Sequence, residues 1–278
     1  MRRMKIVADS AANVTTLKTV DFASVPLKIV TETTEFVDKA SLDVAEMAAY
    51  FDGYKGRSKT SCPNPADFLE AFEGADEVFC VTITSGLSGS YNAACVAKGM
   101  YESEREGARV CVIDSLSAGA EMQLLVERLA HRIENGYTYE EITADITAYQ
   151  KRTGLLFMLG SLKNFAANGR VPMAVAKAAG ILGLRVVGKA GEKGTLEPLD
   201  KCRGEQRALE KIVERMKAEG FAGGKVCIAH NANEAAANAL RARITHAWCD
   251  AAVNVVSCRG LCSYYAEKGG LLVGYEKG

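Results

Sequence analysis

The sequence predicts an α/β fold of two domains, with a mostly parallel sheet in the N-terminal domain and a smaller mixed sheet in the C-terminal domain. In the first half, short β-rich runs alternate with helical patterns, which is typical of a parallel sheet covered by helices on both faces. The pattern changes after Thr153-Gly154. Because 278 residues exceed the size at which one core usually stops growing, we expect one domain over 1–154 and a second over 155–278.

The first half carries the clearer strand and helix patterns. Residues 78–84 are almost continuously apolar, as expected for a strand with both faces buried. Pro65 stands where helices tolerate proline, in the first turn. We expect strands over 5–8, 24–30, 78–83 and 109–113, and helices over 44–51, 65–72, 118–135 and 139–152, with another helix opening at Tyr91.

The second half combines strands with helices on a mixed sheet. Three glycines among charged residues over 188–194 favour a hairpin between the β-rich runs on either side. We expect strands over 155–159, 184–187, 195–199, 225–229, 252–257 and 271–275, and helices over 162–166, 175–182, 205–219 and 233–244.

The composition is that of a globular protein without strong charge bias. Hydrophobic residues make up 48% and charged residues 24% of the chain, and Lys+Arg equal Asp+Glu at 34 each. Because no basic stripe stands out, we expect no nucleic-acid partner. No apolar run approaches membrane-spanning length, so we expect no integral membrane segment.

The cysteine count indicates the compartment. The chain has nine cysteines, and 1–5 lead directly into a strand rather than into a long apolar signal segment. Free thiols persist where the surroundings are reducing. We therefore expect a cytoplasmic protein.

A Gly/Ser turn follows the strand over 78–83. Ser85, Gly86, Ser88 and Gly89 combine hydroxyls with glycines that let a ligand approach the backbone, and the turn opens a helix whose first amides can bind an anion. A capping sequence alone would need one serine. The spacing does not match the Gly-x-Ser-x-Gly elbow of hydrolases, because Ser90 occupies the second glycine position.

Two further segments with hydroxyl-bearing residues are candidates for the same site. Thr60 and Ser61 precede Pro63, and they can simply cap the helix that begins near Asn64. Alternatively, they join the Gly/Ser turn around one carboxylate or phosphate. In that case we expect both turns to lie at the edge of one sheet. Asp9 and Ser10 follow the first strand, at the sheet edge where ligands bind, with a simple loop cap as the alternative.

Other motifs weigh less. Arg170 lies in a loop over 168–172 and is either a surface residue or a partner for an anion. The run 183–190 resembles a phosphate-binding loop, but it ends in alanine and its spacer has the pattern of a strand. A cluster of His246, Cys249, Cys258 and Cys262 lacks the Cys-x-x-Cys spacing of zinc sites, so we expect no metal.

These motifs together resemble the DegV family of fatty-acid-binding proteins. The resemblance rests on Asp9-Ser10, Thr60-Ser61-x-Pro63, the run Ser85-Gly86-Leu87-Ser88-Gly89-Ser90-Tyr91, and Gly169-Arg170-Val171, in this order and with similar spacing. It covers about 5–207 and is poor after Val255. It implies that Thr60, Ser61, Ser85 and Ser88 with backbone groups of the turn hold a fatty acid carboxylate, with Arg170 near the head group. Asp9 and Ser10 are expected behind this group, where Asp9 can orient a hydroxyl or Arg170.

The C-terminal segment departs from the family pattern. DegV proteins usually end in a His-x-Gly-Pro-Gly segment whose histidine joins the head-group network. In this chain the corresponding stretch is 264–270, without histidine or proline, and Tyr265 stands in the histidine position. A phenol can still donate a hydrogen bond, but it carries no positive charge.

The resemblance implies a carrier that buries a long-chain fatty acid in an apolar tunnel and presents its carboxylate to a separate fatty acid kinase. On this interpretation the chain is not an enzyme and needs no cofactor. Two alternatives stay open. One is an enzyme for a small phosphorylated or carboxylated substrate, with Asp9 as base and the Gly/Ser turn as anion cradle; the other is a regulatory protein whose pocket has decayed.

Overall fold

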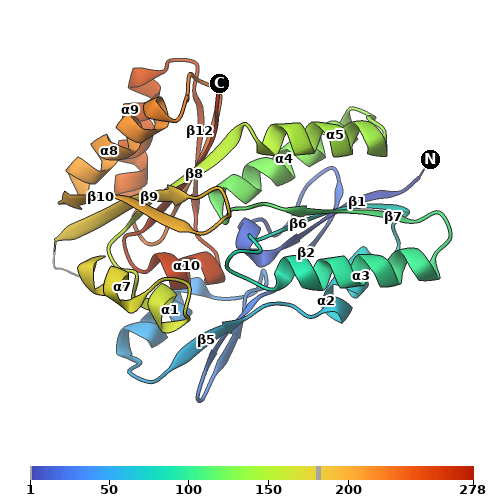
Figure 1. The fold of residues 1–278 in the computed structure, drawn as a ribbon, viewed down its shortest axis with the longest axis horizontal. Coiled ribbons are helices and arrows are strands. Elements are labelled where there is room, and N and C mark those ends of the chain that lie inside the picture. The colour runs from blue at the N-terminus through green and yellow to red at the C-terminus, as the bar shows by residue number, and fades with distance from the viewer. Residues whose placement is uncertain (1, 180–182) are drawn as a thin grey trace.

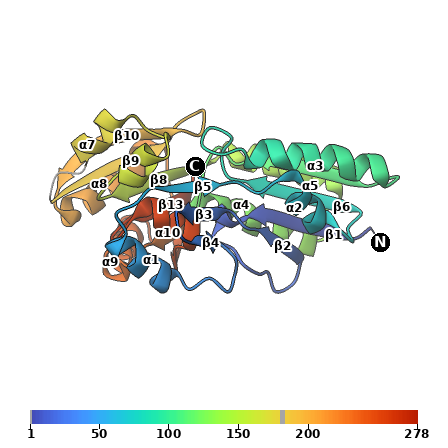
Figure 2. The same cartoon turned by 90° about the horizontal axis from the view of Figure 1, so that it is seen from below.

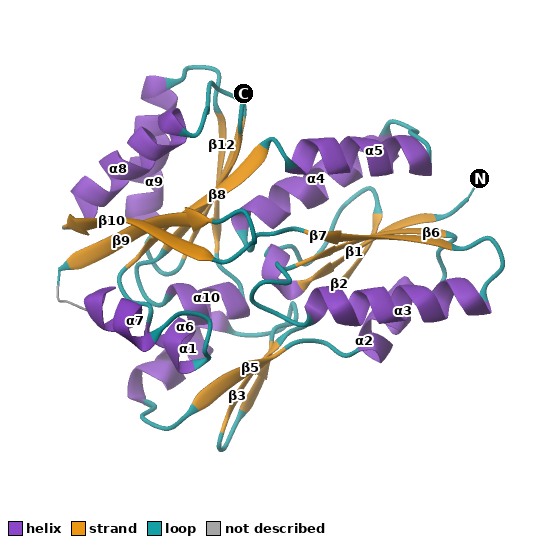
Figure 3. Ribbon diagram, in the orientation of Figure 1, coloured by secondary structure: helices purple, strands orange, loops and turns teal. Residues whose placement is uncertain are grey.

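The computed structural model of the chain describes residues 2–179 and 183–278. Its helices and strands form two α/β lobes that lie side by side, and a short antiparallel sheet lies below the junction of the two lobes (Figure 1). Figure 3 shows the same arrangement by element type. The elements are, in order, β1 (Met4–Asp9), η1 (Ser10–Ala12), β2 (Asp21–Val25), β3 (Lys28–Thr31), β4 (Glu35–Val37), α1 (Val44–Gly53), β5 (Ser58–Ser61), α2 (Pro65–Phe72), β6 (Glu77–Thr82), α3 (Ser90–Glu104), β7 (Arg109–Asp114), α4 (Ala120–Glu134), α5 (Tyr139–Gln150), β8 (Thr153–Leu159), α6 (Lys163–Ala167), α7 (Met173–Ala179), β9 (Leu184–Ala190), β10 (Leu196–Arg203), α8 (Glu205–Ala218), β11 (Lys225–His230), α9 (Glu234–Ala247), β12 (Ala252–Ser257), α10 (Gly260–Ala266) and β13 (Leu271–Glu276).

The first sheet is parallel throughout, in the order β2-β1-β6-β7. Every residue of β6 is buried, because helices cover both faces. On one face, Phe68 of α2 and Tyr101 of α3 pack against Val7 and Cys80. On the other face, Leu125 of α4 packs among residues that include Ile6 and Phe79. The predicted parallel sheet is confirmed.

The second sheet is mixed, in the order β10-β9-β8-β13-β11-β12, and only β11 and β12 run parallel. Helices α8 and α9 cover one face, where Leu209 and Leu240 pack with Ile228. The neighbouring strand residues Cys227 and Ala229 belong to the cluster around α4. Helix α4 therefore lies between the two sheets and joins their cores.

A third sheet of three antiparallel strands, β4-β3-β5, was not expected. The predicted strand over 24–30 is two strands, because Pro26 interrupts it and has no N–H to donate. Strand β5 carries Thr60 and Ser61, so these residues do not cap α2; Asn64 caps it. Ile29 of this sheet packs with Met47 of α1 and Tyr264 of α10.

Most predicted elements agree with the structure to within a few residues, including the β9–β10 hairpin. Strands β4 and β5 and helix α10 were missed. The helix expected over 175–182 is α7, which begins at Met173 and is described as far as Ala179; residues 180–182 lie outside the described part of the chain. Within residues 2–179 and 183–278, no helix combines the length and the apolarity needed to cross a bilayer.

The strands of the first sheet end before residue 115, and those of the mixed sheet lie within 153–276. Figure 2 shows the two lobes from below, with α10 under the mixed sheet. We therefore propose a domain boundary close to the expected residue 154, which lies at the start of β8, the first strand of the mixed sheet.

Candidate functional site

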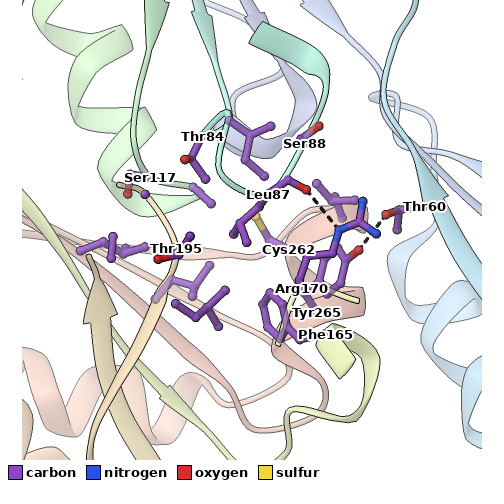
Figure 4. Close-up of a pocket in the computed structure, with 18 of the residues that line it drawn as sticks. Thr60, Thr84, Leu87, Ser88, Ser117, Phe165, Arg170, Thr195, Cys262 and Tyr265 are labelled. Atoms are coloured by element: carbon purple, nitrogen blue, oxygen red, sulfur yellow. Dashed lines mark hydrogen bonds between the residues drawn. The ribbon is translucent and has the colours of Figure 1, made fainter. Parts of the chain in front are cut away.

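A cavity of about 290 Å³ lies where the three sheets meet. Its walls come from the ends of β6 and β7, the edge strand β5, helix α10 and strands β8, β9 and β13. Most of its lining is apolar, with Leu27, Ile83, Leu155, Phe157, Leu159, Phe165, Leu261 and Leu272 among the contributors. Figure 4 shows labelled polar side chains toward both ends of the cavity, with Thr60, Ser88, Arg170 and Tyr265 at one end and Thr84, Ser117 and Thr195 at the other.

Thr60 and Tyr265 meet at one end of the cavity. The hydroxyl oxygens of Thr60 and Tyr265 are 2.7 Å apart, and either can donate. Thr60 lies on β5, where the alternation of a strand directs its side chain inward while Lys59 and Ser61 stay exposed. Its backbone N–H donates to Asn168 Oδ1 at 3.0 Å, which fixes the strand edge to the loop before Arg170.

Tyr265 is held in place by packing as well as by this hydrogen bond. Its ring stacks on Phe165 with the ring centroids 4.5 Å apart. Burial raises the pKa of the Tyr265 phenol, while the hydrogen bond with Thr60 and the charge of Arg170 lower it in part. The phenol therefore stays neutral around neutral pH and acts as a hydrogen-bond donor or acceptor.

Arg170 brings a positive charge to the same end of the cavity. Its Nε donates to the backbone oxygen of Leu87 at 3.1 Å, and its Nη1 donates to the backbone oxygen of Asn168. These bonds hold the half-buried guanidinium across the cavity end, against the Gly/Ser turn (Figure 4). Nη2 takes part in neither of these two bonds, and Arg170 lines the cavity, so this end of the fork can contact an anion.

The structure divides the Gly/Ser turn into two halves. Ser88 and Gly89 line the cavity, and the Ser88 hydroxyl lies 3.0 Å from that of Ser90. Ser85 and Gly86 are exposed and do not line it. The Ser85 amide donates instead to Asp114 Oδ1 at 3.0 Å, which fixes the turn to the end of β7. The residue at the N-cap of α3 is Gly89, so no serine side chain caps from that position.

Ser61, Asp9 and Ser10 take different places around the cavity. Ser61 lines it but is exposed, and its hydroxyl donates to the Cys62 carbonyl at 3.3 Å. Asp9 and Ser10 lie behind the wall: Asp9 accepts from the amides of Ala11 and Ile83, and Ser10 Oγ accepts from the Leu27 amide. Burial of Asp9 raises its pKa to about 7, with these amide bonds offsetting part of the effect. Asp9 is fully buried and cannot reach a ligand.

The Gly/Ser turn and the Thr60 segment converge as predicted, but they do not belong to one sheet. The turn follows β6 of the parallel sheet, while Thr60 lies on the three-stranded sheet. Gly89 allows their close approach, since a Cβ on it would lie 3.1 Å from Cys62 Sγ.

Asn168 is a site residue that the sequence reasoning missed. Its side chain accepts from the Thr60 amide and donates to the Tyr264 hydroxyl at 3.0 Å, so it joins β5 to α10. Its position directly before Gly169-Arg170 was the available signal. Among the described residues, no group of three His, Cys, Asp or Glu side chains is arranged to hold a metal ion. Cys249 is exposed, and Cys258 and Cys262 are buried.

The chain is similar to known proteins over nearly its whole length. A sequence model described as "Uncharacterised protein, DegV family" matches residues 3–277, so the likeness extends well past Val255, where the motifs alone became poor. A DegV domain-containing protein of Streptococcus pneumoniae is 44% identical over 276 residues, 98% of each chain.

Two solved structures are similar over the whole length. A DegV family protein from Eubacterium eligens, loaded with heptadecanoic acid, is 44% identical with a TM-score of 0.97, covering 99% of this chain and 100% of that one. The Fatty Acid Kinase B3 protein of Streptococcus pneumoniae, loaded with linoleic acid, is 43% identical with a TM-score of 0.97, covering 99% of each chain. The predicted α/β fold, with a parallel sheet and a mixed sheet, is therefore confirmed.

Proposed function

Since the chain belongs to the DegV family, we propose that it binds a long-chain fatty acid, with the acyl chain in the apolar cavity and the carboxylate at the end formed by Thr60, Ser88, Arg170 and Tyr265. The observation that carries the proposal is the Thr60–Tyr265 hydroxyl pair beside Arg170 at the end of an apolar cavity. The relatives from Eubacterium eligens and Streptococcus pneumoniae hold fatty acids.

The chemistry of the cavity suits both parts of such a ligand. Each buried CH₂ contributes about 0.8 kcal/mol before the costs of binding, so the apolar walls supply most of the affinity. A carboxylate needs donors, and three hydroxyls with one guanidinium provide them. The polar cluster therefore orients the acid, and the walls retain it.

The other predicted site residues act around this cluster. Ser61 and the Gly89 backbone complete the lining beside Thr60 and Ser88. Ser85 and Gly86 shape the turn rather than touch the ligand, because they are exposed and lie outside the cavity. Asp9 and Ser10 position the cavity wall through the amides of Ile83 and Leu27.

On this proposal the chain is a carrier without a cofactor, and it presents the carboxylate to a fatty acid kinase, as the relative named Fatty Acid Kinase B3 protein suggests. The enzyme alternative loses its base, because Asp9 is sealed behind the wall. The decayed-pocket alternative is disfavoured by the intact cavity. A cytoplasmic location fits the nine cysteines, all of them free thiols.

Native mass spectrometry tests the proposal directly. The purified protein is expected to carry an added mass equal to a long-chain fatty acid, to lose it on organic extraction, and to regain one equivalent of linoleic or heptadecanoic acid. A protein that carries no acid and takes none up would refute the carrier. With ATP and a fatty acid kinase, the loaded protein should yield acyl phosphate, and omission of the kinase should abolish it.

A further inference from the structure

The cavity has a second polar end, opposite the Thr60–Tyr265 pair. Thr84, Ser117 and Thr195 line it, and we call them the tail-end hydroxyls (Figure 4). The tail of a saturated fatty acid offers nothing to a hydroxyl. Thr195 is exposed, so solvent can satisfy its hydroxyl, but the buried hydroxyls of Thr84 and Ser117 in an otherwise apolar wall need an explanation.

Two of the tail-end hydroxyls come from adjacent loops at the carboxyl end of the parallel sheet. The backbone N–H of Thr84, after β6, donates to the backbone oxygen of Ser117, after β7, at 2.9 Å. The side chains are almost wholly buried, with Thr84 1% exposed and Ser117 2% exposed. Backbone pairing thus places two buried hydroxyl-bearing residues on neighbouring segments of the cavity wall.

The Ser117 hydroxyl has no hydrogen-bond partner among residues 2–179 and 183–278. Glu121, in the first turn of α4, is the nearby carboxyl: burial raises its pKa and the neighbouring Ser117 hydroxyl lowers it in part, but the two do not form a well-aligned hydrogen bond, and Glu121 Oε1 accepts from Thr153 Oγ1 at 2.7 Å. Thr84 Oγ1 accepts from the Gly86 amide at 3.0 Å, which leaves its own O–H available. Buried polar groups are normally paired, so both hydroxyls have capacity for a ligand.

The β9–β10 hairpin closes this end of the cavity. Gly194, at the hairpin tip, has φ +67° and packs so closely on Thr84 that a Cβ there would overlap the Thr84 side chain. A chain that reaches this end therefore meets the tail-end hydroxyls under the hairpin. Lys189, the lysine among the described lining residues, pairs with Glu219 at 2.9 Å, so this part of the described lining presents no unpaired cation to a second carboxylate.

We propose that the cavity accepts an acyl chain that carries a hydroxyl group at or near its methyl end. The ligand hydroxyl accepts from Thr84 and donates to Ser117 Oγ, while the carboxylate stays at the Thr60 end. This inference rests on the fatty-acid-binding function proposed above and specifies the substrate class of the same site. A neutral hydroxyl fits this end, whereas a second carboxylate lacks a counter-charge.

The test compares matched pairs of acids on the delipidated protein by calorimetry: hexadecanoic with 16-hydroxyhexadecanoic acid, and octadecanoic with 18-hydroxyoctadecanoic acid. In a purely apolar tunnel, an added hydroxyl should weaken binding by about 10- to 100-fold. For the wild type, we expect the Kd of at least one hydroxy acid to be no more than about threefold above the Kd of the matching unsubstituted acid, or below it. Hexadecanedioic acid should bind much more weakly than either.

The ratio of the two Kd values is then measured in Thr84→Val/Ser117→Ala and in a control, Thr82→Val. Thr82, the last residue of β6, is fully buried two positions before Thr84 but does not line the cavity. In the double variant, the affinity for the hydroxy acid relative to that for the unsubstituted acid should fall about tenfold, and the control should keep the wild-type ratio. A wild type that discriminates tenfold against both hydroxy acids, or a double variant with the wild-type ratio, would overturn the inference. Failure to bind any of these acids would refute the proposed function instead.

Discussion

The hydroxyls of Thr60 and Tyr265 lie 2.7 Å apart, although the two residues are 205 positions apart in the chain. The pair joins β5 to α10, and Asn168 reinforces the junction by binding the Thr60 amide and the Tyr264 hydroxyl. A ligand carboxylate placed here contacts both parts of the chain at once. Binding of the head group is therefore expected to stabilise the junction of the two domains.

Removal of either hydroxyl of this pair should weaken fatty acid binding. Thr60→Val or Tyr265→Phe keeps the shape but leaves its partner unpaired, and each should cost about 1–3 kcal/mol of binding free energy. Because each change disables the same pair, the double variant should lose less than the sum. Displacement of a fluorescent acyl probe measures this, with the exposed Thr245→Val on α9 as the control. Unchanged affinity in both single variants would make the pair purely structural.

Arg170 should matter for the charge of the ligand. Arg170→Ala should weaken the binding of linoleic acid more than the binding of linoleyl alcohol, because the alcohol has no charge to neutralise. Arg170→Lys should recover only part of the loss, since lysine lacks the planar fork that binds the Leu87 and Asn168 carbonyls. Calorimetry on acid and alcohol gives both values. Equal losses for the two ligands would remove Arg170 from the head-group site.

The residues at the Thr60 end of the cavity show which parts of the site can be predicted from the sequence. Thr60, Ser88 and Arg170 were predicted from short motifs, and the structure brings them to one cavity end. The sequence did not indicate that Thr60 lies on a separate sheet, because β5 is four residues long and mostly polar. Helix α10 was missed for a different reason. Six of its seven residues, from Gly260 to Ala266, are buried, so it shows no amphipathic period.

Asp9 should give the stability of the protein a measurable pH dependence. Its pKa is raised to about 7 from the ordinary 3.8, so between these values the folded state holds a proton that the unfolded state has released. The free energy of unfolding should therefore fall as the pH rises from about 4 to about 7, by roughly 4 kcal/mol at 1.36 kcal/mol per pH unit.

Urea unfolding of the wild type and Asp9→Asn at pH 5 and pH 8 isolates this contribution. Asp38 and Glu121 also have pKa values raised by burial, so the readout is the difference between the two proteins' pH slopes. The variant should show the shallower fall, and Asp52→Asn, at an exposed position, should keep the wild-type slope. Identical slopes for wild type and Asp9→Asn would contradict the expected titration.

Tyr265 should make head-group binding insensitive to pH where a histidine would not. Burial raises the pKa of the phenol, so it does not titrate between about pH 5 and 8, whereas histidine ordinarily titrates near 6.5. In Tyr265→His, protonation on lowering the pH adds a positive charge beside Thr60, so the affinity for a fatty acid should rise as the pH falls. Burial and the neighbouring Arg170 both favour the neutral ring, which should place the rise in the acidic part of this range. Measurements with the fatty alcohol provide the control, because its affinity should follow the same course in both proteins. A wild-type affinity for the acid that already changes steeply across this range, or a variant that matches the wild type at every pH, would show that position 265 does not sense the carboxylate.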